Sequence, residues 1–143
     1  MRAVALVCLS ACWTDPPAVE APRAPLHPAS PLVAEIRAHP LALTMATLHD
    51  FVIEYAVTNQ SSSTVATGFF QSRLMINGEP SMQWGSAVGN GAVDPEWEAL
   101  APQHSLTGAY TFGEHLFFKP GDYTLVLVVG SASSRPLRVH VAP

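Results

Sequence analysis

Short runs in which apolar and polar residues alternate make up most of the chain after about residue 41. The clearest runs are residues 51–58 and 137–141, in which every second residue is apolar. A period of two is typical of a β-strand that buries one face and exposes the other. Runs of this kind, together with denser apolar stretches, predict strands over 41–46, 51–58, 65–76, 79–84, 97–100, 106–112, 114–118, 123–129 and 137–141.

Turn-forming residues separate these runs. Asn77-Gly78 is a strong signal for a two-residue hairpin, because both residue types tolerate the positive φ of a type I′ turn. Pro80 in the returning run predicts a strand that is short or lies at an edge. Seven to nine short strands with no long helical pattern predict an all-β antiparallel β-sandwich. An antiparallel barrel and a jelly roll are the alternatives.

The longest irregular stretch is the glycine-rich segment 85–95, which we expect to form a loop. Trp84 and Trp97 bracket this segment. Adjacent aromatic pairs at 69–70 and 117–118 indicate that one member of each pair points away from the core. Exposed aromatic and apolar residues of this kind favour a partner-binding patch, and burial beneath loops is the alternative. The candidate binding residues are Trp84, Trp97, Asp94, Glu96 and Glu98.

Three short motifs resemble those of bacterial immunoglobulin-like domains. They are Val57-Thr58-Asn59, Leu100-Ala101-Pro102 and Pro120-Gly121-Asp122-Tyr123-Thr124-Leu125. The resemblance spans about residues 41–142 and implies an immunoglobulin-like sandwich in which the Tyr123 side chain bonds back across a corner. The chain departs from the pattern in having no intersheet cysteine pair and no tryptophan on a central early strand. A looser similarity to the intracellular proteinase inhibitor family rests on the Asn59 and Pro120-Gly121-Asp122-Tyr123 positions of the same motifs.

The first twelve residues have the order of a secretory signal. A basic start at Arg2 is followed by an apolar run over 3–11 that ends in small residues. Leu9-Ser10-Ala11-Cys12 resembles a bacterial lipobox, which implies that lipid is attached to Cys12 and that cleavage precedes it. The alternative is that Cys8 and Cys12 are ordinary small apolar residues.

Prolines then mark a spacer. Seven of the 13 prolines lie between residues 12 and 40, at Pro16, Pro17, Pro22, Pro25, Pro28, Pro31 and Pro40. Proline lacks the N–H donor and fixes φ, so this stretch reads as a semi-rigid tether. The predicted organisation is a signal peptide over 1–11, a tether over 12–40 and an immunoglobulin-like β-sandwich domain over 41–143, with 32–36 either forming a brief turn or packing on the domain.

Composition narrows the classes of partner. The 143 residues include 7 Lys and Arg against 11 Asp and Glu, for a net charge of −4. This balance excludes the basic surface that sequence-independent nucleic-acid binding requires. At 48% hydrophobic and 13% charged, the chain is not a disordered acidic or basic tail.

No residue pattern names a reaction. Nucleophile-elbow and phosphate-loop motifs are absent from the sequence, so we expect neither an enzyme nor a cofactor. A sandwich that brought His49, His104 and His115 together, with Met45 or Met82, would offer a soft-metal site. Asp94, Glu96 and Glu98 offer oxygen ligands for Ca²⁺, with a solvated acidic rim as the alternative.

These observations favour an exported protein, lipid-anchored at the bacterial cell envelope through Cys12, whose immunoglobulin-like module has a non-catalytic binding or structural role. The expected partners are the membrane and another envelope protein, and the oligomeric state is left open. One alternative is a proteinase inhibitor or regulator that presents the 85–95 loop. The other is a metal-handling envelope protein.

Overall fold

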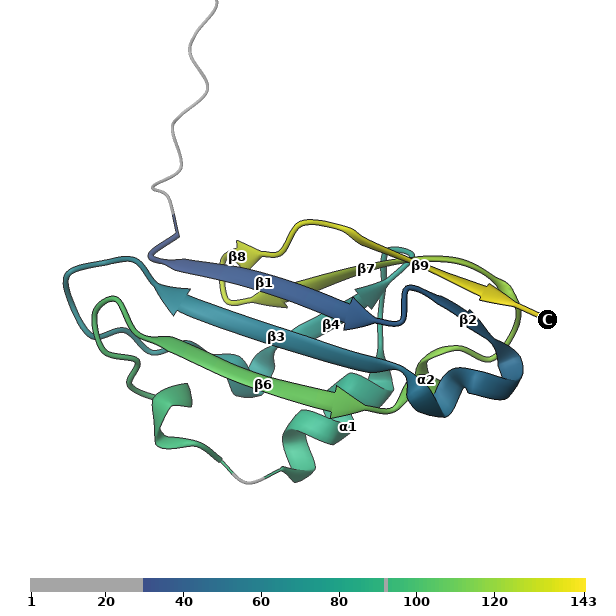
Figure 1. Cartoon of the computed structure of the whole chain (residues 1–143). Coiled ribbons are helices and arrows are strands. Elements are labelled where there is room, and N and C mark those ends of the chain that lie inside the picture. The colour runs from purple at the N-terminus through teal and green to yellow at the C-terminus, as the bar shows by residue number, and fades with distance from the viewer. Residues whose placement is uncertain (1–29, 92) are drawn as a thin grey trace, which may run out of the picture.

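Two β-sheets pack face to face in the computed structural model, which describes residues 30–91 and 93–143 (Figure 1). The smaller sheet has the strand order β1-β3-β6 and is antiparallel. The larger sheet has the order β2-β9-β7-β4-β5, with β8 paired to β7. The strands are β1 (Leu32–His39), β2 (Ala42–Thr44), β3 (Val52–Asn59), β4 (Arg73–Ile76), β5 (Glu79–Pro80), β6 (Ser105–Thr111), β7 (Gly121–Val129), β8 (Ala132–Ser133) and β9 (Leu137–Ala142).

This order of strands is that of an immunoglobulin-like sandwich, so the predicted fold class is confirmed. In the usual lettering, β1, β3 and β6 occupy the places of strands A, B and E, and β9, β7 and β4 those of G, F and C. After leaving the smaller sheet, the chain adds β2 to the edge of the larger one, parallel to β9. The connection from β5 to β6 holds the helix α1 (Met82–Asn90) where strand D would lie. The remaining helical segments are η1 (Met45–Asp50), η2 (Phe69–Gln71), η3 (Pro95–Trp97) and α2 (Gly113–Leu116).

The core lies between the two sheets and follows the predicted alternation. Ile53 and Val57 on β3 are fully buried, as are Leu125 and Leu127 on β7. On β9 the side chains of Val139 and Val141 face inward while Arg138 and His140 are exposed. The aromatic pairs also split as expected: Phe69 and Phe117 are buried, and their neighbours Phe70 and Phe118 are exposed.

Hydrogen bonds from one buried side chain join two of the sequence motifs. The fully buried Asn59 side chain donates to the carbonyl oxygens of Leu100 and Ala101 at 3.0 and 3.2 Å. Its Oδ1 accepts a hydrogen bond from the amide of Ser61 at 2.9 Å. The end of β3 is thereby fixed to the loop that precedes β6. These residues therefore have a structural role.

The third motif forms the predicted corner. The Tyr123 hydroxyl donates to the carbonyl oxygen of Lys119, four residues upstream, at 2.7 Å. Asn77 and Gly78 both adopt positive φ at the hairpin between β4 and β5, and β5 is only two residues long. The sequence therefore located both the corner and the hairpin correctly.

The domain begins earlier than the predicted tether boundary at residue 40. Residues 32–39 form β1, which pairs with β3 over eight residues, and its Leu32 and Ala34 side chains are buried. The two prolines that made this stretch resemble a spacer, Pro31 and Pro40, lie just outside the strand and leave its amides free to pair. The predicted signal peptide over 1–11, Cys12 and most of the predicted tether lie outside the described residues.

Three predicted elements are wrong in type. Most of the expected 85–95 loop belongs to α1, which begins where the Ser81 side chain accepts a hydrogen bond from the Trp84 amide. The predicted strand over 114–118 is largely the short helix α2, and the one over 97–100 is replaced by η3 and an isolated bridge between Val65 and Leu100. In each case the burial of a large side chain outweighs local strand or loop preference.

Candidate functional site

The two tryptophans proposed as contact residues are core residues. Trp84 is 0% exposed and Trp97 is 6% exposed, so neither indole presents a surface to a partner. The Trp84 Nε1–H donates to the Ser72 hydroxyl at 3.0 Å, and its ring packs against Tyr110 with a centroid separation of 5.2 Å. Burial, the alternative reading of these residues, is therefore correct.

The acidic residues of the predicted binding set lie at the surface, directly after α1. Asp94 and Glu98 are exposed, and Glu96 is half-buried. The Asp94 carboxylate accepts a hydrogen bond from the Glu96 amide at 2.9 Å and so caps η3. This cap gives the exposed Asp94 a structural role.

The histidines do not assemble as the metal-handling alternative required. His104 precedes β6 and His115 follows it, so seven strand residues, roughly 20 Å of chain, separate the two side chains. Within residues 30–91 and 93–143, no group of three or more His, Cys, Asp or Glu side chains is placed to hold a metal ion.

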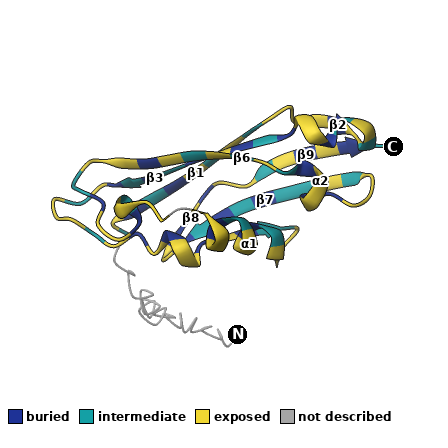
Figure 2. Cartoon of the chain, turned by 90° about the horizontal axis from the view of Figure 1, so that it is seen from below, coloured by how far each residue is buried: buried dark blue, intermediate teal, exposed yellow. Residues whose placement is uncertain are grey.

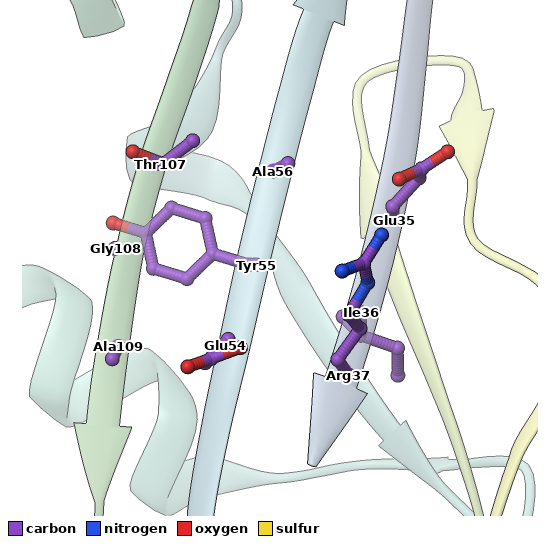
Figure 3. A pocket seen from close by; sticks show the side chains of 9 residues that line it. All are labelled: Glu35, Ile36, Arg37, Glu54, Tyr55, Ala56, Thr107, Gly108 and Ala109. Atoms are coloured by element: carbon purple, nitrogen blue, oxygen red, sulfur yellow. The ribbon is translucent and has the colours of Figure 1, made fainter.

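A shallow hollow lies over the smaller sheet, and Figure 3 shows the residues that line it. It exists because small residues, Ala56, Gly108 and Ala109, occupy the middle of β3 and β6. Arg37 and Glu54 sit opposite each other across β1 and β3 beside these small residues. The hollow is an open depression with side chains of both charges at its margin.

A larger groove, of about 680 Å³, runs between α1 and the end of β6. The helix buries Trp84 and Val88, four residues apart, and turns its other faces toward solvent (Figure 2). The apolar part of the lining is therefore made of side chains that the core does not use, and Met82 is 80% exposed. The lining residues are Met82, Gln83, Ser86, Ala87, Tyr110, Thr111, Phe112 and His115.

The strand beside this groove has a free edge. β6 is the last strand of the smaller sheet and pairs only with β3, in seven consecutive pairs without a bulge. Its sequence, Ser-Leu-Thr-Gly-Ala-Tyr-Thr, contains no charged residue and no proline. Exposed edges are usually protected by charges, prolines or bulges. Of these devices, β6 has none.

Which amides of β6 reach this edge follows from the register. The Asn59 amide donates to the His104 carbonyl oxygen at 3.0 Å, one pair beyond the start of β6. Hydrogen-bonded and non-hydrogen-bonded pairs alternate along an antiparallel ladder. Even-numbered residues of β6 therefore bond to β3, and the N–H and C=O groups of Thr107 and Ala109 point to the free edge. No hydrogen bond from the described residues reaches those outward groups.

Tyr55 lies against β6 and is also affected by the charge of Asp94. Its ring crosses beneath Gly108, and a Cβ at Gly108 would collide with the Tyr55 hydroxyl, so only glycine fits there (Figure 3). Burial of the phenol, with smaller contributions from the charges of Tyr110 and Asp94, raises the pKa of Tyr55 to about 12. The charge of Asp94 therefore acts on the Tyr55 phenol, whose hydroxyl lies against Gly108 of β6.

The raised pKa of Tyr55 makes stability fall at alkaline pH. In the unfolded chain this phenol ionises near its usual pKa of 10.0, whereas in the fold it keeps its proton up to about 12. The unfolded state thus binds fewer protons between these values, and stability decreases as the pH rises. We expect Tyr55→Phe to remove about 1 kcal/mol of the stability difference between pH 9 and pH 11, measured by urea unfolding. An identical pH dependence in the variant would contradict the burial of this hydroxyl.

No family model matches the chain, and no curated protein matches it. Two similar solved structures are of the CARDB domain of the PF1109 protein from Pyrococcus furiosus. The crystal structure, in complex with di-metal ions, has a TM-score of 0.48 and 19% sequence identity, and the match covers 78% of this chain and 92% of that one. The solution NMR structure has a TM-score of 0.47 and 17% identity, with 78% and 94% covered.

Sequence reasoning did not find the α1–β6 groove, and two of the binding residues it named, Trp84 and Trp97, are buried. The uncharged run 105–112 was the available signal in the sequence. Over residues 30–91 and 93–143, none of the helices has both the length and the apolar character needed to span a bilayer.

Proposed function

We propose that this protein is a non-catalytic binding module, held at the bacterial cell envelope by lipid on Cys12, that contacts another protein through the α1–β6 edge. The observation that carries the binding role is an unprotected strand edge lying beside an apolar groove. Exposed edges of this kind pair readily with other chains unless they are blocked, and β6 lacks a block.

The geometry of the smaller sheet suits a tethered module. β1, which begins at residue 32 after most of the proline-rich stretch, lies at one edge of this sheet, and β6 lies at the other, with β3 between them. A partner bound to β6 is therefore on the side of the sheet away from β1 (Figure 1). An inhibitor of proteinases is less well supported, because the segment expected to present an exposed loop is mostly helical.

The anchor is tested by Cys12→Ala. Lipid attachment requires the thiol at this position, so the variant is expected to lose incorporation of labelled fatty acid and to move from the membrane to the soluble fraction. Cys8→Ala is the matched control and should keep both properties. Unchanged membrane retention of Cys12→Ala would refute the lipid anchor and leave the binding role to be judged separately.

The contact surface is tested by photo-cross-linking in intact cells. A photoreactive amino acid in place of Met82 should give an adduct of one discrete mass, because Met82 lines the groove and is exposed. Ala87→Arg in the same chain should suppress this adduct by filling the groove. The control position is Arg138 on β9, which lies in the other sheet and is also exposed. Equal adducts from positions 82 and 138 would contradict the proposed surface.

A further inference from the structure

From the free edge of β6 and the charge around it we infer that the partner segment is a basic, extended peptide that pairs with β6 as a fourth strand of the smaller sheet. This inference rests on the proposed function and names the chemistry of the partner.

Backbone pairing is the first step of the argument. The outward N–H and C=O groups of Thr107 and Ala109 alternate along the edge with the spacing that an added strand requires. Both residues are exposed and carry small side chains, so an incoming backbone meets no bulky obstacle there. Peptides that add a strand to a sheet edge obtain affinity from these main-chain hydrogen bonds and specificity from pockets for alternate side chains.

The groove supplies such a pocket. It lies between an edge strand and a helix, and Met82, Ala87, Tyr110 and Phe112 provide its apolar lining. Because successive side chains of a strand point to opposite faces, only every second residue of an added strand would enter this groove. Apolar residues are therefore expected at alternate positions of the peptide.

The negative charge of the chain around β6 favours basic residues at the peptide positions that lie outside the groove. Between Arg73 and Lys119 the chain contains no Lys or Arg, and its only charged residues are Glu79, Asp94, Glu96, Glu98 and Glu114. This segment includes α1, η3, β6 and α2, which together build the edge. A partner with Lys or Arg at the positions outside the groove is attracted to this edge, and an acidic one is repelled.

The same considerations disfavour two other occupants. A second copy paired through its own β6 would present the same segment, which has acidic residues and no Lys or Arg between Arg73 and Lys119, so charge opposes this pairing. Residues 13–29 of this chain contain five prolines, which have no N–H to donate, and carry Asp15 and Glu20 against Arg23, so the segment is not basic. A basic segment of another protein fits best.

The test measures binding of the full chain to a capped peptide of alternating Lys and Val, seven residues long to match β6. Fluorescence anisotropy should show saturable binding that weakens as salt is added. A peptide with Glu in place of Lys should bind at least tenfold more weakly. Failure of the Lys peptide to saturate, or equal binding of the Glu peptide, would overturn the inference.

Two matched variants separate backbone pairing from other contacts. Ala109→Pro removes an N–H that points to the free edge and leaves the hydrogen bonds between β6 and β3 in place. It should therefore weaken binding about tenfold. Ala109→Val keeps the N–H and should bind like the unaltered chain. If Ala109→Pro lowers the thermal midpoint, Thr107→Pro gives the same comparison at the next outward amide. Equal affinity for a folded proline variant would refute strand addition.

The charge is tested by Glu96→Lys and Glu98→Lys, which should weaken binding of the Lys peptide and strengthen that of the Glu peptide. Two results together would refute this inference and leave the proposed function standing. They are a cross-link from position 82 in cells and unchanged peptide binding by the proline variants at 107 and 109. Concentration-dependent self-association that proline at 109 abolishes would instead identify a second copy as the occupant and overturn the inference.

Discussion

Replacing Trp84 with Ala should destabilise the fold by about 3–5 kcal/mol, the range for removing a large aromatic side chain from a packed core. The indole is fully buried, bonds to Ser72, and packs against Tyr55 and Tyr110 at centroid separations of 6.0 and 5.2 Å. It is also, with Val88, one of the two buried residues of α1. The change should therefore loosen the helix and abolish the groove, as well as lower the free energy of unfolding.

Urea unfolding followed by tryptophan fluorescence and circular dichroism gives this measurement. Gly85→Ala is the matched control on the same helix, because a Cβ at Gly85 meets no atom within 4 Å. It should stabilise the chain by about 0.5–1 kcal/mol, since glycine is unfavourable inside a helix. A loss of less than 1 kcal/mol on replacing Trp84 would contradict its place in the core.

Removing residues 1–40 should abolish cooperative folding, whereas removing residues 1–29 should not. The longer deletion takes away β1, its eight pairs with β3, and the buried Leu32 and Ala34 side chains. It also uncovers one side of β3, which carries the fully buried Ile53 and Val57. A domain of this size is stable by only about 5–15 kcal/mol, so it does not survive the loss of a whole strand.

Thermal unfolding and size-exclusion chromatography distinguish the two fragments. We expect a single sharp transition and a monomer for the shorter deletion, and a broad transition or aggregate for the longer one. Equal thermal midpoints would show that β1 is dispensable and would restore the domain boundary that the prolines suggested.

Local patterns predicted the elements whose stability is local. The alternation over 51–58 gave β3 and its buried face, and Asn77-Gly78 gave the hairpin, because both depend on neighbouring residues. Tyr123 was identified for the same reason, since its bond spans only four residues. Asn59 joins the two loop motifs across 41 residues, and its buried amide could be assigned only from the fold.

α1 and β1 were missed for opposite reasons. Gly85 and Gly89 lower the helix propensity of α1, and the packing of Trp84 against residues distant in the sequence offsets this loss. β1 carried the right alternation at Leu32 and Ala34, but its flanking prolines indicated a spacer. The free edge of β6 could not be located from the sequence, because a free strand edge depends on which strands are neighbours in space.

Amide hydrogen exchange of β6 tests the central claim most directly. In the free chain, the outward amides of Thr107 and Ala109 should exchange rapidly, while those of Leu106, Gly108 and Tyr110, which bond to β3, should be slow. On addition of the Lys and Val peptide, Thr107 and Ala109 should become protected and the inward amides should not change. Protection of Thr107 and Ala109 in the free chain, or protection by the peptide elsewhere on the surface, would contradict a partner-binding edge at β6.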